Sequence, residues 1–314
     1  MSNINITILI PFLNEAVNVP FIISELNLFC KTNNNLQFEI IFIDDGSTDE
    51  SVKLLSEGKK QFKSKIIKFS KNFGAHAALR AGILKSEGNY ITFMYADLQD
   101  PLELINRMYE KCEGEGKDIC WASRNNFTTG FFERTFSRIY AALIKKYVSK
   151  DFPENGFDVV MFNSKIKESL NSNIENNSSV FLQIMTLGFK SDSVAYKKVD
   201  RRAGQSKWTF SKRMKLMIDS FVSFSYAPIR FVTAIGISLF VIGLMLSVYL
   251  IFRKILYNDL AAGWAMLISI IMLGFGITNI SLGIIAEYLW RTLDSSRKRP
   301  VFIIDQIIDL KNDN

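Results

Sequence analysis

The sequence predicts an α/β protein in which a parallel sheet with helices on both faces is followed by a membrane-embedded helical hairpin. Strand-like apolar runs alternate with helix-like segments through residues 5–96, which is typical of a parallel sheet. Residues 231–252 and 260–286 carry no charged side chain, and each run is long enough to cross a hydrocarbon core about 30 Å thick. We therefore expect four parts: a cytoplasmic domain over 1–210, an interfacial amphipathic helix over 211–227, a transmembrane hairpin over 228–290 with spans at about 231–252 and 262–286, and a cytoplasmic tail over 291–314.

The chain opens with a β-α-β pattern. Residues 5–15, NITILIPFLNE, are a β-rich apolar run, and residues 38–51 are a second run that ends in acids, glycine and turn residues. Residues 19–30 between them have helical spacing. Two further strands are expected at 65–70 and 88–96, separated by a segment of helical composition.

Ligands of such sheets bind beyond the carboxyl ends of the strands. That rule predicts that polar residues scattered in the sequence become neighbours. They are Asn14, Glu15, Asp44, Asp45 and Asp97.

The later part of the chain contains further helix-like and loop-like segments. Residues 131–149 look helical, and residues 157–170 read as a strand and then a helix. Residues 200–211 are polar, basic and turn-rich, which favours a loop. Apolar side chains at three- and four-residue steps over 214–224, next to basic residues, are typical of a helix lying at a membrane surface.

Charge and composition narrow the class of protein. Basic residues precede the first apolar run and follow the second, which places both termini in the cytoplasm of a multi-pass protein of the inner membrane. A net charge of +7 fits an anionic partner. The three cysteines lack the close pairs of a zinc site, and His76, the only histidine, excludes a multi-histidine metal centre.

Residues 93–103, FMYADLQDPLE, place three acids directly after an apolar run. Asp100, a following proline and Glu103 form a capping-box arrangement, so both acids are interpreted as starting a helix. Asp97 lies upstream, at the expected strand end. Magnesium or manganese bound with substrate phosphates needs only one or two protein carboxylates, so Asp97 is the candidate ligand although Tyr95 stands where an acid would complete D-x-D.

Five motifs occur in order and are followed by the two apolar runs: ILIPFLNE, FIDDGSTDES, FSKNFGAHAALRAG, ADLQDP and RAGQSKW. Together they resemble the polyprenyl-phosphate glycosyltransferases of glycosyltransferase family 2, a group that includes GtrB-type bactoprenol glucosyltransferases and dolichyl-phosphate mannose synthase. The resemblance covers essentially the whole chain and implies a GT-A nucleotide-sugar fold. The family often has DADLQDP, so Tyr95 departs from its pattern.

The resemblance also implies the nucleotide-sugar site. Asp45, with Asp44 beside it, would accept hydrogen bonds from the base or ribose, and Asp97 would bind Mg²⁺ or Mn²⁺ with Gln99 beside it. Residues implied to line or approach the nucleotide are Pro11, Asn14, Glu15 and Arg80.

A second set of residues is implied to serve the acceptor, a lipid phosphate. Asp158 matches the position often assigned as the family's catalytic aspartate, and is either a base or an orienting group. A phosphate monoester is mostly dianionic at pH 7, so a strong general base is dispensable and cationic capture is needed instead. The candidate cations are Arg124, Arg138, Arg201, Arg202 and Lys207.

The expected activity is an inverting, metal-dependent transfer of a hexose, glucose from UDP-glucose by family likeness, to polyprenyl phosphate at the cytoplasmic membrane face. The nucleotide sugar, polyprenyl phosphate and a lipid bilayer are the expected partners, with no nucleic acid. Gly274, Gly276 and Gly283 would permit close helix packing in a homo-oligomer.

Two alternatives remain open. A processive polysaccharide synthase shares the fold but carries Q-x-x-R-W, whereas QSKW here is one residue shorter and has lysine for arginine. A nucleotide-binding membrane scaffold that has lost catalysis is the other, with Tyr95 as its clue.

Overall fold

The computed structural model describes residues 4–124, 157–172, 179–199, 263–297 and 300–310, together with short helical stretches between 142 and 146 and between 232 and 256. The chain divides into two compact units. The first comprises Met1–Met217 and Pro300–Asn314, and the second comprises Ile218–Arg299.

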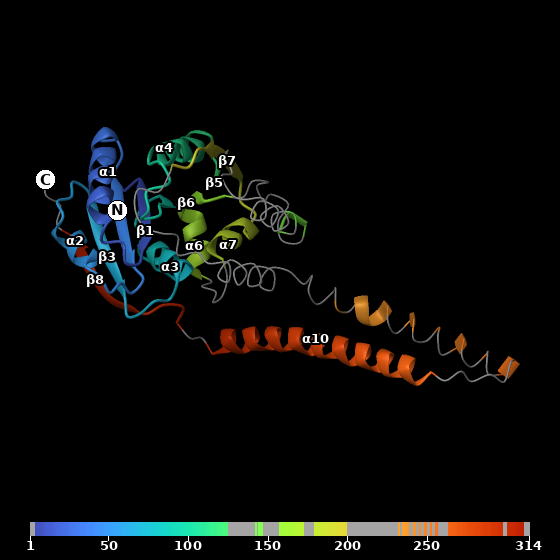
Figure 1. The fold of residues 1–314 in the computed structure, drawn as a ribbon. Coiled ribbons are helices and arrows are strands. Elements are labelled where there is room, and N and C mark those ends of the chain that lie inside the picture. The colour runs from blue at the N-terminus through green and yellow to red at the C-terminus, as the bar shows by residue number, and fades with distance from the viewer. Residues whose placement is uncertain are drawn as a thin grey trace. The chain divides into compact units, whose positions relative to one another are not determined.

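The first unit is built on one sheet, which has eight strands within the described residues (Figure 1). The strand order is β7-β5-β6-β4-β1-β2-β3-β8, and β4, β1, β2 and β3 are parallel neighbours. The strands are β1 (Ile6–Phe12), β2 (Phe38–Asp44), β3 (Lys63–Phe69), β4 (Tyr90–Phe93), β5 (Ile119–Arg124), β6 (Val159–Asn163), β7 (Ser191–Tyr196) and β8 (Ile304–Leu310). The predicted α/β class with a parallel sheet is confirmed.

Helices cover both faces of this sheet. They are α1 (Val19–Thr32), α2 (Ser51–Glu57), α3 (Ala75–Lys85), α4 (Glu103–Tyr109), which continues into the π-helix η1 (Glu110–Gly114), α6 (Ser164–Ser172) and α7 (Val180–Thr186). Right-handed crossovers place α1 and α2 on one face and α3 on the other, where α3 contacts α6 and α7. The Asn106 side chain of α4 donates to Asn33, just after α1, so α4 lies on the α1 face.

The sequence explains these elements locally. Every residue of β1 and β2 is buried, as expected for central parallel strands covered on both faces. In α1, proline occupies the first turn and the buried side chains recur at three- and four-residue steps, which turns one apolar stripe toward the sheet. The helix predicted over 19–30 is confirmed.

Strand direction decides which loops meet. β6 runs antiparallel to both β4 and β5, and β7 runs parallel to β5. The amino end of β6 therefore lies at the same edge of the sheet as the carboxyl ends of β1, β2, β4, β5 and β7. That edge is called the carboxyl edge below.

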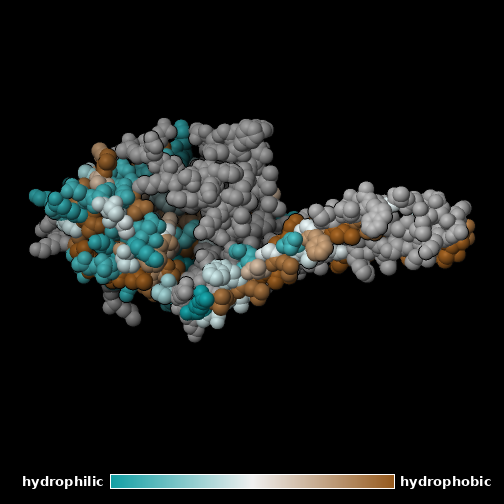
Figure 2. Space-filling view, turned by 60° about the horizontal axis from the view of Figure 1, so that its bottom comes forward, coloured by the Kyte–Doolittle hydropathy of each residue, from teal (hydrophilic) through white to brown (hydrophobic). Residues whose placement is uncertain are grey.

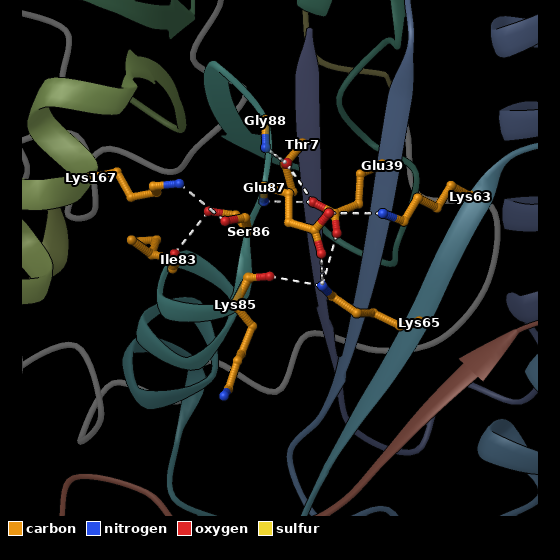
Figure 3. A network of polar contacts seen from close by, with 10 residues as sticks. All are labelled: Thr7, Glu39, Lys63, Lys65, Ile83, Lys85, Ser86, Glu87, Gly88 and Lys167. Carbon is orange, nitrogen blue, oxygen red and sulfur yellow. Dashed lines mark hydrogen bonds and ion pairs between the residues drawn. The ribbon is translucent and has the colours of Figure 1, made fainter. Parts of the chain in front are cut away.

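A network of polar contacts closes the opposite edge (Figure 3). Glu39 is fully buried and accepts hydrogen bonds from the Thr7 hydroxyl at 2.8 Å and the Glu87 backbone at 2.9 Å. The Lys65 ammonium lies 2.8 Å from the other Glu39 carboxylate oxygen. A methyl group at Gly88 would lie 2.7 Å from the Thr7 nitrogen, so glycine is required there. The network joins β1, β2 and β3 to the turn before β4.

The C-terminal segment returns to the first unit as β8, which pairs antiparallel with β3. No strand was predicted there. Phe302, just before β8, stacks on Phe69 at the end of β3, with ring centroids 5.5 Å apart. The last strand of the sheet is thus supplied by residues that follow the second unit.

The second unit contains α10 (Trp264–Ser296), whose exposed side chains include many apolar ones (Figure 2). Within the described part of the chain, however, no helix has the length and apolar character needed to cross a membrane. The predicted transmembrane hairpin over 228–290 and the multi-pass localisation are therefore wrong. The prediction took the charge-free length of each run as sufficient for a membrane span.

Replacing Lys65 by methionine should destabilise the first unit by about 3–5 kcal/mol, because it leaves the buried Glu39 carboxylate without its cation. The measurement is the free energy of unfolding in urea. Lys63→Met is the matched control: Lys63 pairs with Glu87 on the surface at 2.8 Å, so its loss should cost less than about 1 kcal/mol. Equal costs for the two variants would contradict this account.

Candidate active site

At the carboxyl edge, the loops after β1 and after β2 are connected by hydrogen bonds from backbone N–H groups to side chains. Asn14 adopts a positive φ of 52° just after β1. Its side-chain oxygen accepts from the Thr48 backbone at 2.8 Å, and its own N–H donates to the Ser47 hydroxyl at 2.9 Å. The Glu15 N–H likewise donates to the Ser51 hydroxyl at 2.9 Å. Pro11 is buried within β1, opposite Ile43 of β2.

Asp44 ends β2 and Asp45 directly follows it, and the two carboxylates lie in different environments. The Asp45 carboxylate accepts hydrogen bonds from the backbone N–H groups of Phe73, at 2.7 Å, and Gly74, at 3.0 Å. Burial nevertheless raises the pKa of Asp45 above its ordinary value. One oxygen of the fully buried Asp44 accepts from the Ser47 N–H at 2.8 Å, while the other has no hydrogen-bond partner among the described residues.

The glycine of the DDGS motif sets how closely these loops approach. Gly46 has a φ of +80°, and a methyl group there would lie 2.7 Å from the Lys71 carbonyl carbon and 2.8 Å from the Asn72 nitrogen. A side chain would therefore separate this turn from the loop before α3. That loop provides the N–H groups that Asp45 binds.

Arg80 is buried in α3 and donates a hydrogen bond to the Gln183 side chain of α7. One turn earlier, His76 packs edge-on against Phe181, with ring centroids 5.4 Å apart. Burial, with a smaller effect of the Arg80 charge, lowers the pKa of His76 to about 4. The histidine is thus neutral at pH 7.

The loop after β4 holds the candidate metal ligands. Asp97 and Gln99 are half-buried, and the Gln99 N–H lies 3.4 Å from an Asp97 carboxylate oxygen. The Val199 N–H donates to the Gln99 carbonyl at 2.9 Å, which fixes this loop beyond the end of β7. Tyr95 packs edge-on against Phe93, with ring centroids 5.8 Å apart, and so joins an aromatic cluster with Phe181.

Asp100 has a different role from the one predicted. No side-chain capping bond is present at the start of α4, so the helix-capping interpretation is wrong. The buried Asp100 carboxylate instead accepts a hydrogen bond from the Tyr196 hydroxyl at 2.5 Å and lies 3.5 Å from the Lys198 ammonium. The same hydroxyl lies 2.9 Å from a carboxylate oxygen of Asp158, immediately before β6.

Burial dominates the proton affinities of this cluster. It raises the pKa of Asp100, against the opposing effects of Lys198 and Tyr196. Burial, together with the charges of Asp100 and Asp158, also raises the pKa of Tyr196. Tyr196 and Lys198 were not predicted as site residues, because only the pairing of β7 with β5 brings the end of β7 to the edge where Asp100 and Asp158 lie.

The remaining predicted residues are only partly placed. Arg124 ends β5, paired with Tyr196 of β7, so its backbone lies at the carboxyl edge. The other predicted acceptor-binding residues lie outside the described residues: Arg138, Arg201, Arg202 and Lys207.

The donor set fits a divalent cation shared with substrate phosphates. Asp97 offers a carboxylate and Gln99 an amide oxygen, both of them hard ligands suited to Mg²⁺ or Mn²⁺. Within the described residues, no group of three or more histidine, cysteine or acidic side chains is arranged to hold a metal. Substrate oxygens and water would therefore have to supply most of the coordination sphere.

A parallel sheet whose carboxyl edge gathers acids from several loops defines an α/β enzyme with its substrate site at that edge. The sequence profile described as Glycosyl transferase family 2 matches residues 7–191. The chain therefore belongs to glycosyltransferase family 2 and is a glycosyltransferase, which confirms the predicted family and enzyme class.

Curated relatives match nearly the full chain. The uncharacterized glycosyltransferase YkcC of Bacillus subtilis (strain 168) is 31% identical, covering 99% of this chain and 96% of its own. The putative glycosyltransferase CsbB of the same strain is 33% identical, covering 96% and 91%. The undecaprenyl-phosphate 4-deoxy-4-formamido-L-arabinose transferase of Proteus mirabilis (strain HI4320) is 27% identical, covering 98% and 95%.

The neutral state of His76 predicts a pH-dependent stability. Because its folded pKa of about 4 lies below the unfolded value of 6.5, the unfolded chain takes up the proton first and stability falls as the pH drops from 6.5 toward 4. We expect the wild-type protein to lose about 2.5 kcal/mol relative to His76→Gln across this window. Urea unfolding of both proteins at each pH measures the difference, and a constant difference would refute the assignment.

Proposed function

We propose that this glycosyltransferase moves a hexose, glucose from UDP-glucose, to polyprenyl phosphate with inversion at the anomeric carbon. The carrying observation is that Tyr196 joins Asp158 to the loop that bears Asp97, so the candidate acceptor and metal residues share one edge of the sheet. The acceptor class is supported by relatives that match 98% of this chain and are named undecaprenyl-phosphate 4-deoxy-4-formamido-L-arabinose transferase. The predicted bilayer contact and homo-oligomer remain predictions.

In this proposal the acceptor phosphate oxygen attacks the anomeric carbon while the bond to the nucleoside diphosphate breaks. When bound at Asp97 and Gln99, a divalent cation would neutralise the negative charge that grows on the leaving diphosphate. The unpartnered Asp44 oxygen is suited to accept a hydrogen bond from the nucleotide. Asp158 orients the acceptor or removes its last proton.

Arg80 contributes indirectly. The resemblance implies an arginine that approaches the nucleotide, but Arg80 is buried and hydrogen-bonded to Gln183. We propose that it fixes α7 against α3 beneath the nucleotide loops, because a buried guanidinium with an amide partner is held in place more firmly than a surface cation.

The donor sugar is the finer point to test. Several relatives are named for 4-deoxy-4-formamido-L-arabinose, so this sugar is the second candidate. Purified protein is incubated with undecaprenyl phosphate and each radiolabelled nucleotide sugar, and the lipid-linked product is counted and sized. One sugar per lipid is expected from UDP-glucose. A long glycan would favour the processive synthase, and donor binding without transfer from any sugar would favour the inactive scaffold.

In the same assay, Asp97→Asn should lower transfer about 100-fold or more, because it weakens the charge stabilisation of the leaving diphosphate. Glu103→Gln is the matched control: Glu103 lies in the same stretch, is exposed and begins α4. It should transfer at the wild-type rate. Full turnover by Asp97→Asn in a chelator would refute the metal assignment.

Tyr95→Asp tests whether position 95 faces the metal. The Tyr95 ring packs on Phe93, so a carboxylate there should leave the metal concentration for half-maximal transfer unchanged. Loss of the ring pair should lower the free energy of unfolding by about 1 kcal/mol. If a manganese titration instead gave a lower metal concentration for half-maximal transfer, this result would show that the side chain reaches the ion.

A further inference from the structure

Tyr196 connects two carboxylates that come from distant segments. Its hydroxyl oxygen lies 2.5 Å from Asp100, in the loop after β4, and 2.9 Å from Asp158, before β6. Only 4% of Tyr196 is exposed, so solvent has little access to compete for these contacts. The phenol therefore links the proposed acceptor residue to the loop of the proposed metal ligands.

The Tyr196 hydroxyl has a single proton with which to contact the two carboxylates. A phenol has one proton, so the hydroxyl donates to one carboxylate or the other, or shares its proton between the two. Two carboxylates around one oxygen repel each other unless a cation offsets their charge. Lys198, 3.5 Å from the same Asp100 oxygen, provides that cation.

The backbone around Tyr196 is fixed on both sides. Tyr196 is paired with Arg124 in the sheet, and three residues later the Val199 N–H donates to the Gln99 carbonyl at 2.9 Å. Asp158 is also anchored, because its N–H donates to the Ala122 carbonyl at 3.0 Å. A rigid frame therefore presents the hydroxyl to the Asp158 carboxylate.

We propose that Tyr196 is a positioning residue whose hydroxyl holds the Asp158 carboxylate in the orientation that the acceptor requires, with Asp100 and Lys198 balancing the charge around it. The inference rests on the proposed function, in which Asp158 contacts the acceptor. It adds a requirement that the sequence motifs do not contain.

The test is Tyr196→Phe, which removes one oxygen and keeps the ring. We expect kcat for transfer to fall about 10- to 100-fold, as for a misplaced catalytic group, while the donor Kd measured by calorimetry is unchanged. In an Asp158→Asn background the same substitution should cause no further loss, because the group it positions is already altered. Tyr90→Phe is the control: it removes a hydroxyl that donates to Glu113 at 2.7 Å, at the opposite end of β4, and kcat should be unchanged.

The outcomes separate the two claims. If the wild-type protein transfers no sugar, the proposed function fails and the inference falls with it. If the wild type is active and Tyr196→Phe behaves like Tyr90→Phe, or if its effect adds to that of Asp158→Asn, only the inference is overturned. Should Tyr196→Phe fail to bind the donor, Lys198→Met replaces it: kcat should fall at unchanged donor Kd, and an unchanged kcat overturns the inference.

Discussion

The candidate site depends on one constraint, the antiparallel insertion of β6 between β4 and β5. In a fully parallel sheet, Asp158 at the start of β6 would lie at the edge opposite the nucleotide loops. The reversal brings it to the carboxyl edge, beside the ends of β4 and β5. Tyr196 can reach both Asp100 and Asp158 only because of this pairing.

Buried carboxylates are stabilised in different ways at the two edges of the sheet. At one edge, Glu39 is neutralised by Lys65 and two hydrogen-bond donors. At the carboxyl edge, Asp45 is held by backbone N–H groups, and Asp100 by a phenol with the Lys198 ammonium nearby. Backbone and hydroxyl donors stabilise a carboxylate without cancelling its charge.

That difference bears on the proposed reaction. An anionic nucleoside diphosphate would be repelled by these carboxylates unless a cation lay between them. In the proposed site, a divalent ion at Asp97 would fulfil this requirement with one protein carboxylate, and Tyr95 need not contribute because its ring packs on Phe93. The departure from D-x-D is thus compatible with the proposed metal site.

The sequence predicted what depends on local pattern. Apolar periodicity located α1 and the first strands, and the strand-end rule correctly placed Asn14, Asp45 and Asp97 at one edge. β8 was not predicted, because the pairing of a strand that follows a separate unit depends on tertiary contacts and not on local pattern. A long run without charged residues was also taken to indicate a membrane span. Among the described residues, however, no helix, α10 included, has the length and apolar character that a span needs.

Asp100 shows most clearly why local pattern was not enough. An acid, a proline and a glutamate at the right spacing describe a helix start, and α4 does begin at Glu103. The carboxylate, however, is buried beside the phenol at the end of β7 and an ammonium group two residues further on, almost a hundred residues away. A charged partner inside the protein is worth more to a buried carboxylate than a capping bond near the surface. Tertiary contacts therefore outcompeted the local motif, and they did so at the position where the candidate acceptor and metal residues meet.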